Sequence, residues 1–323
     1  MGRWSTGPGV PGVTGSITQR HTGFAVVMRR LARFTATRYK PYYLLYAVLW
    51  TLAVEATAAL VSHPGVGWRP GGATGVRIVV VAGVLLYLRM VDEQKDLGYD
   101  RLHHPDRPLV TGAITTPELR IAMTALAVAA IGASLALSVW SAVWITVVLA
   151  YGLVLWGLER ASAAIRDRLL LNLAVTYPVQ VWLTVYVVVS AIGTGQVESR
   201  WVTAWVAVVF AGAFLGFEFA RKTTSTPRPG EWFYSNTLGA TGSAAAVALC
   251  SLLAVGCDLA LVGPWRYPVA HAVVGWIVVV GLVFPLWGTL RFRRRHGDYP
   301  VAAAVLFILT LYATLITQAL VLP

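Results

Sequence analysis

The sequence predicts an all-α polytopic membrane protein built as a bundle of nine transmembrane helices. Hydrophobic residues make up 57% of its 323 residues and charged residues 12%, whereas soluble domains carry roughly a quarter charged residues. Apolar runs long enough to cross about 30 Å of hydrocarbon as helix recur along nearly the whole chain after Pro41. These runs are continuous rather than alternating with period two, which favours helices over an outer-membrane barrel.

Nine spans are expected in order along the chain. They lie at 42–62, 76–97, 118–137, 139–158, 169–192, 201–221, 236–261, 268–290 and 300–321. No hydrophilic insert is long enough for a separate soluble domain, so residues 42–323 are predicted to form a single membrane domain. The polar loops after the second and sixth spans are where we expect the chemistry.

The chain before the first span has two parts. Residues 1–23 are rich in glycine and poor in apolar side chains, which predicts a disordered N-terminus. Residues 24–41 are basic and partly apolar, which predicts a short interfacial helix on an anionic membrane surface. No cleavable signal precedes the first span, so we expect an unprocessed chain.

The basic residues, which give a net charge of +12, gather in alternate loops. Seven precede the first span and fourteen lie in the loops on the same side, while the other side has only Arg69, Arg77, Arg200 and Arg266. The positive-inside rule then predicts an integral protein of the cell membrane with a cytoplasmic N-terminus. This distribution indicates a lipid bilayer partner and no nucleic acid.

An acidic pattern closes the second span. Asp92, Asp96 and Asp100 recur every four residues, so on an α-helix they drift by only about 40° per step and line one stripe. Glu93 borders the same stripe. Carboxylates this close repel one another unless a cation neutralises them, and hard oxygen ligands suit Mg²⁺.

A proline-bracketed turn follows the acidic stripe. It reads Pro-Asp-Arg107-Pro-x3-Gly112 and is predicted to point Arg107 back toward the carboxylates. Because the planar guanidinium matches phosphate oxygens, stripe and turn together predict a site for a metal-bridged diphosphate leaving group. An ordinary solvated helix end explains isolated acids, but not three acids in register followed by this turn.

The pattern Asp92-x3-Asp96-x3-Asp100, followed by Pro-Asp-Arg-Pro-x3-Gly, resembles the first aspartate-rich motif of the UbiA superfamily of intramembrane prenyltransferases. The resemblance implies a catalytic bundle that ionises an isoprenoid diphosphate with Mg²⁺ as cofactor. The three aspartates are then catalytic metal ligands and Glu93 a further ligand. Lys95 and Arg107 are expected to contact the diphosphate, with the active site facing the cytoplasm.

A second segment matches the place of the family's other aspartate-rich motif. Family members show two aspartates four residues apart, whereas this chain has Glu218 and Lys222. We expect Glu218 to be a supporting catalytic metal ligand, and Arg221 and Lys222 to contact phosphate. The alternative for the two cations is an ordinary basic helix end. Tyr234 and Asn236 in the following loop are expected to cap the closed site, as the family's loops do.

The fate of the allylic cation is open at this point. An aromatic or lipid-phase acceptor attacks it in most UbiA-type prenyltransferases, and its own double bonds attack it in the terpene cyclases that resemble the same superfamily. The variants Asp-Glu-x-Lys-Asp and Glu-x2-Arg-Lys resemble the cyclase branch, which favours cyclisation of farnesyl or geranylgeranyl diphosphate. A transporter with intramembrane carboxylates is the third hypothesis, but the acids gather at one rim and no inverted repeat is visible.

Residues within the spans supply candidates for the cavity. Polar side chains are costly in lipid and face cavities, which selects Glu55, Asn172 and Gln180 together with Tyr177. Glu55 is either a base that quenches a cation or a buried partner of Arg89. Rings that stabilise a cation or merely anchor the protein at the interface are Tyr43, Trp50, Tyr177, Trp182, Tyr186, Phe214 and Trp287.

Overall fold

The computed structural model describes residues 15–63, 65–228, 230–295 and 297–323, and every named element in these ranges is a helix. The α-helices are α1 (Gly15–Arg38), α2 (Pro41–Ser62), α3 (Gly72–Lys95), α4 (Leu97–His103), α5 (Thr116–Leu135), α6 (Val139–Ala161), α7 (Ala163–Asp167), α8 (Leu169–Thr176), α9 (Pro178–Gly193), α10 (Val206–Arg221), α11 (Ser235–Val262), α12 (Val269–Trp276), α13 (Val283–Arg294) and α14 (Val301–Val321). Three 3₁₀ helices complete them: η1 (Trp201–Trp205), η2 (Pro264–Arg266) and η3 (Ile277–Leu282).

Nine helical segments in the described ranges are long and apolar enough to cross a membrane. Five are the single helices α2, α3, α5, α6 and α14, and four are composite: α8 with α9, η1 with α10, α11 with η2, and α12 with η3 and α13. The break between α8 and α9 falls at Pro178, whose ring removes a backbone donor. The predicted all-α class and all nine predicted spans are confirmed.

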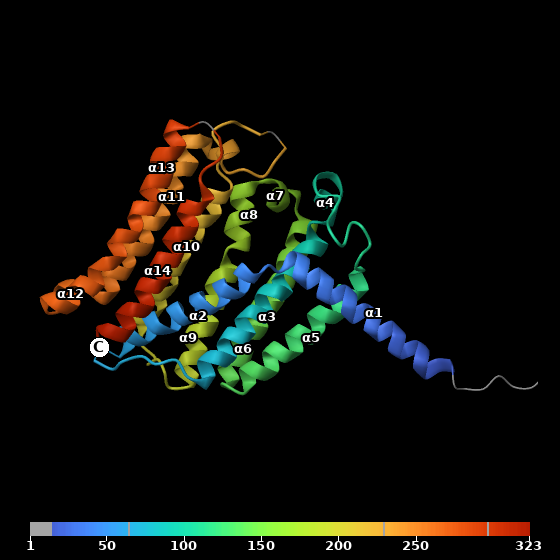
Figure 1. Ribbon diagram of the computed structural model, residues 1–323, viewed down its shortest axis with the longest axis horizontal. Coiled ribbons are helices and arrows are strands. Elements are labelled where there is room, and N and C mark those ends of the chain that lie inside the picture. The colour runs from blue at the N-terminus through green and yellow to red at the C-terminus, as the bar shows by residue number, and fades with distance from the viewer. Residues whose placement is uncertain (1–14, 64, 229, 296) are drawn as a thin grey trace, which may run out of the picture.

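The helices form one bundle in which α2 contacts α3 and α9 as well as α14 (Figure 1). The short helices α4 and α7 and the segments 222–228 and 230–234 all lie at the same end of the bundle (Figure 1). We call this the motif end, because both sequence motifs reach it. The segment 65–71, which leads into α3, lies at the opposite end.

The helix before the first span is longer than predicted. It begins at Gly15, so the disorder expected for residues 1–23 is wrong from residue 15 onward, and residues 1–14 lie outside the described residues. α1 leaves the bundle obliquely (Figure 1) and is held at its C-terminal half. Phe34 is buried there, Arg30 pairs with Glu118 at 3.2 Å, and Arg38 pairs with Glu93 at 2.6 Å. Its contact with a lipid surface stays a prediction.

α10 and α11 pack closely against each other at a glycine. A Cβ built on Gly212 would lie 2.6 Å from the carbonyl oxygen of Cys250 and 2.9 Å from the backbone nitrogen of Ala254. Backbone atoms cannot move aside as a flexible side chain does, so the two helices touch at this point only because the residue is glycine. Cys250 and Cys257 are both free thiols.

We predict that Gly212→Ala lowers the stability of the bundle, since overpacking typically costs about 1–3 kcal/mol. The thermal unfolding midpoint in detergent measures the effect. Gly157→Ala is the matched control, because Gly157 is an exposed helical glycine with no atom within 4 Å of a built Cβ. Equal midpoints for the two variants would contradict the close packing.

Candidate active site

The first motif lies where α3 meets α4. α3 ends at Lys95, and Asp96 forms the joint with φ −88° and ψ 5°, so the predicted helical stripe is interrupted at its middle residue. The backbone hydrogen bonds nevertheless continue across the joint, from Asp96 N to Asp92 O at 2.8 Å and from Asp100 N to Asp96 O at 2.9 Å. The four-residue register of the three aspartates is therefore kept.

Lys95 joins the carboxylates of this motif to a neighbouring helix. Its Nζ lies 3.6 Å from Asp92 Oδ1, 4.0 Å from Asp96 Oδ1 and 3.1 Å from Glu159 Oε1. Asn172 of α8 donates to the same Glu159 oxygen at 2.8 Å. Sequence reasoning missed Glu159 because a single acid at the end of a span has the signature of a solvated helix end. Asn172 therefore lies with the charged residues around Lys95 and not in the apolar interior.

Burial raises the pKa of Asp96 to about 7. The charge of Lys95 opposes this shift, while the negative charges of Asp92, Asp100 and Glu159 add to it. A carboxylate in this position is costly to ionise without a further cation nearby.

The turn after the motif holds Arg107 as predicted. Arg107 Nη1 donates to Asp100 Oδ2 in a close ion pair, and Asp100 is almost fully buried. The turn closes at Gly112, whose φ of +74° lies in the left-handed region that favours glycine. The second carboxylate oxygen of Asp100 is buried without a partner among the described residues.

The second motif forms a compact ion cluster at the end of α10. Glu218 pairs with both Arg221 and Lys222, the latter at 2.9 Å, and accepts a hydrogen bond from the hydroxyl of Tyr234 at 3.1 Å. Lys222 also lies over the Tyr234 ring, 5.4 Å from its centroid. Burial and the adjacent Arg221 lower the pKa of Lys222, against the opposing charges of Glu218 and Asp96. The structure thus gathers Glu218, Arg221, Lys222 and Tyr234 in one place.

The two motifs face each other across the motif end. Arg221 and Lys222 lie within electrostatic reach of Asp92, and Lys222 lies within that of Asp96. About half of each of the side chains of Asp92 and Arg221 is accessible, 47% and 46%. Anionic groups of the first motif and cationic groups of the second therefore lie near one another at the motif end. We call the carboxylates at Asp92, Asp96, Asp100 and Glu159 the acid wall, and Arg221 and Lys222 the cation wall.

The loop between α10 and α11 reaches over to α4. Trp232 stacks on Tyr99 with ring centroids 4.3 Å apart. Asn236 accepts from Arg228 N at 3.1 Å and donates to the carbonyls of Arg228 and Glu231. Asn236 lies in the first turn of α11, not in the loop as the sequence predicted, and its amide holds the preceding loop instead of being free for the acids. A cavity of about 530 Å³ lies between this loop and α8.

Glu93 and Glu55 are both buried partners of arginine side chains. Glu93 faces Arg38 and Arg89, with Arg89 at 3.0 Å, and so helps to anchor α1, while its role as a metal ligand stays a prediction. Glu55 pairs at 2.7 Å with Arg77, not with Arg89 as hypothesised. Glu55 and Arg77 are both fully buried. Arg77 therefore lies inside the bundle, although the count of basic residues placed it in a loop.

The candidate rings have different partners. Tyr177 contacts Phe214, Trp50 lies edge-on to Phe210, and Tyr43 stacks on Tyr39. Trp182 stacks on Trp144, the Tyr186 hydroxyl bonds Ser134, and Trp287 is 43% exposed. Gln180 donates to the hydroxyl of Tyr46 at 3.2 Å.

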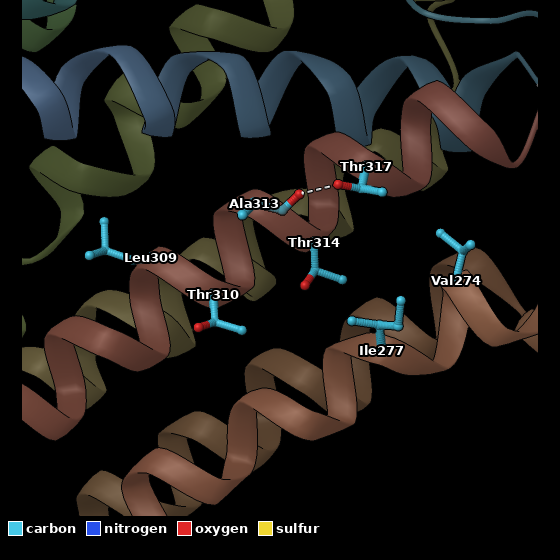
Figure 2. A pocket seen from close by; sticks show the side chains of 7 residues that line it. All are labelled: Val274, Ile277, Leu309, Thr310, Ala313, Thr314 and Thr317. Carbon is cyan, nitrogen blue, oxygen red and sulfur yellow. Dashed lines mark hydrogen bonds between the residues drawn. The ribbon is translucent and has the colours of Figure 1, made fainter.

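A second cavity, of about 380 Å³, lies between α14 and the α12–η3 segment. Figure 2 shows its lining, in which Thr310 and Thr314 of α14 face Val274 and Ile277, while Thr317 donates to the carbonyl of Ala313 at 2.8 Å. It contains no charged side chain and none of the motif residues, so it is separate from the candidate active site.

Two solved structures share this arrangement of helices. A UbiA homolog from Aeropyrum pernix K1, in its apo form, matches with a TM-score of 0.52 over 82% of this chain and 97% of its own, at 17% identity. The chain has the UbiA fold. A structure described as digeranylgeranylglyceryl phosphate synthase in membranes shares the UbiA fold with a TM-score of 0.56, over 90% of this chain and 99% of its own, at 12% identity. No protein-family model and no curated protein matches the sequence.

We predict that Arg77→Met strongly destabilises the protein. Arg77 also bonds Ser190 and Gln196, and its loss leaves Glu55 buried without its charge partner, which typically costs about 3–5 kcal/mol. Thermal unfolding in detergent measures the loss, with the exposed Arg69→Met as matched control. The double variant Glu55→Gln with Arg77→Met is expected to recover part of the stability; no recovery would contradict a charge-pair role.

Proposed function

We propose that the chain is a Mg²⁺-dependent intramembrane enzyme of the UbiA type that ionises an isoprenoid diphosphate. The observation that carries this is the pair of oppositely charged walls at the motif end of a UbiA-fold bundle. The negative charge of a diphosphate would let it bind a metal held by the carboxylates of one wall and, at the same time, the cations of the other wall. The membrane interior below is the natural place for its isoprenoid tail.

The acid wall fits Mg²⁺ in the way that this ion usually binds. Within the described ranges, no group of three or more His, Cys, Asp or Glu side chains is placed to hold a metal by itself. Mg²⁺, however, commonly binds through one or two carboxylates and the substrate's own phosphates. The side chains of Asp92 and Asp96 are 47% and 23% exposed and would hold it, with Asp100 and Glu218 in support. Bound there, Mg²⁺ would supply Lewis-acid assistance to pyrophosphate departure.

The residues of the chain position and neutralise the leaving group. Lys222 and Arg221 lie on the opposite wall, and an anionic substrate favours their charged forms in this buried setting. Lys95 and Arg107 orient the aspartates: Lys95 holds Asp92 and Asp96 to Glu159, and Arg107 holds Asp100. The stack of Trp232 on Tyr99 joins the loop before α11 to α4, and such a contact would limit water access during ionisation.

Cyclisation of the resulting allylic cation is the fate we propose, on farnesyl or geranylgeranyl diphosphate. The support is the resemblance of both variant motifs to the cyclase branch, together with the contacting rings of Tyr177 and Phe214, the latter about one turn of α10 before Glu218. Transfer to an aromatic or lipid-phase acceptor is the second candidate. The basic residues place the motif end and the N-terminus on the cytoplasmic face of the cell membrane in this proposal.

We predict that the purified protein releases pyrophosphate from geranylgeranyl diphosphate only with Mg²⁺, and that EDTA abolishes the release. Asp96→Asn removes a metal ligand and is expected to lower the rate by roughly 10²-fold or more, the equivalent of several kcal/mol of lost stabilisation. Asp167→Asn is the matched control, because Asp167 is an exposed carboxylate paired only with Arg166. Metal-dependent ion flux without pyrophosphate would favour a transporter and contradict the proposal.

The fate of the cation is tested by leaving out any acceptor. We predict that the enzyme, Mg²⁺ and a farnesyl or geranylgeranyl diphosphate alone yield a cyclic hydrocarbon or cyclic terpene alcohol, detected by gas chromatography and mass spectrometry. A product that forms only after an aromatic acceptor is added would contradict cyclisation and establish the second candidate.

A further inference from the structure

The segment that follows the cation wall is not helical. α10 ends at Arg221, and Lys222 has left the helical region with φ −122° and ψ 34°. Thr223 and Thr224 come next and are both buried. Buried backbone groups outside a helix need hydrogen-bond partners from elsewhere in the chain, because an unpaired one is costly. The partners of this segment therefore determine where Lys222 lies.

The turn between α13 and α14 supplies these partners. Residues 223–225 pair with residues 297–299 in a short antiparallel bridge centred on Thr224 and Asp298. Three hydrogen bonds join the two segments: Tyr299 N to Thr223 O at 2.9 Å, Ser225 N to Gly297 O at 2.9 Å, and Gly297 N to Ser225 Oγ at 2.7 Å. We call residues 297–299 the clamp segment, because they hold the chain just after the second motif.

The clamp segment is itself held by α13 through Tyr299. The Tyr299 side chain is buried, and its hydroxyl donates to the carbonyl of Pro285 at 3.1 Å. The centroid of its ring lies 5.7 Å from that of Phe292. A Cβ built on Gly288 would lie 2.7 Å from the hydroxyl oxygen, so the tyrosine packs tightly on this helix. α13 and α14 contain neither motif, yet together they fix a segment that holds the second one.

The start of α11 holds the same stretch of chain. Tyr234 N donates to Lys222 O at 2.9 Å, and Thr224 N donates to Ser235 Oγ at 3.0 Å. The Tyr234 hydroxyl donates to Glu218, the carboxylate that pairs with both members of the cation wall. A shift of this stretch would therefore move Lys222 directly, and would reach Glu218 through Tyr234.

We propose that the clamp segment is a positioning element of the active site: by pairing with residues 223–225, it sets where Arg221 and Lys222 meet the diphosphate. The inference rests on the proposed function. Both cations contact the diphosphate in the bound substrate as well as in the transition state. The clamp segment therefore acts on the affinity for the diphosphate, with less effect on kcat.

Backbone hydrogen bonds carry this role rather than the ion pair that joins the same two regions. Arg228 Nη2 lies 2.8 Å from Asp298 Oδ1, and the two side chains are 38% and 56% exposed. Exposed ion pairs contribute little, because water screens them and both side chains lose freedom. A decisive variant must therefore disturb the backbone of the clamp segment, and Gly297 offers that opportunity.

Gly297→Ala strains the clamp segment without removing a side chain. Gly297 has φ +140°, in the region that favours glycine, and no atom of the described residues lies within 4 Å of a built Cβ. The full-length enzyme in nanodiscs is assayed for pyrophosphate release from geranylgeranyl diphosphate with Mg²⁺. We expect the KM for this substrate and the inhibition constant of inorganic pyrophosphate to rise roughly tenfold, the effect of one lost hydrogen bond to a charged group, while kcat changes far less.

Gly65→Ala is the matched control. Gly65 has φ +90°, likewise has no atom of the described chain within 4 Å of a built Cβ, and lies at the end of the bundle opposite the motifs (Figure 1). Its alanine variant carries a similar backbone strain and is expected to keep both constants unchanged. Ser225→Ala removes the acceptor of Gly297 N, and it carries the test if Gly297→Ala fails to fold.

The two failures are distinguishable. Unchanged KM and inhibition constant in the clamp variants, an equal rise in Gly65→Ala, or a fall in kcat alone overturns the inference and leaves the proposed function standing. Absence of pyrophosphate release by the wild type removes the proposed function and the inference with it.

Discussion

Charge neutralisation at one end of an apolar bundle is the constraint on which the rest of the structure depends. Carboxylates of α3, α4 and α6 lie on one wall of the motif end and the cations at the end of α10 on the other. Neither set is stable alone in a setting with little water. Lys95 and Arg107 hold the carboxylates of the acid wall together, and Glu218 holds Arg221 and Lys222. A bound metal and an anionic substrate would neutralise the charge that remains on the two walls.

The fold was predictable from sequence because each span must satisfy its backbone hydrogen bonds within itself and present apolar side chains to lipid. Nine continuous apolar runs therefore sufficed to place the helices. Local patterns were predictable for the same reason: the proline turn that returns Arg107 to Asp100 involves residues only seven apart. The resemblance carried by these motifs led to the fold that the solved structures share.

Contacts between distant helices were not predictable. Glu93 lies beside the aspartates in sequence, but helix geometry turns it toward Arg38 of α1. Glu55 finds Arg77 on the neighbouring helix, and nothing in the spacing of a single chain distinguishes that partner from Arg89. Glu159 joins the acid wall only because α6 packs against α3. The rings of Tyr46, Phe210 and Tyr312 meet only because α2, α10 and α14 converge. These contacts depend on how the helices pack, and no pattern in the neighbouring sequence indicates them.

The central claim is that the two charged walls bind one metal–diphosphate complex. A structure of the protein with Mn²⁺ and a non-reactive isoprenoid thiodiphosphate, with Mn²⁺ located by anomalous scattering, tests it most directly. The account predicts Mn²⁺ at Asp92 and Asp96, diphosphate oxygens at Arg221 and Lys222, and the tail directed toward Phe214. Mn²⁺ bound away from these aspartates, or a diphosphate lying outside the space between the walls, would contradict it.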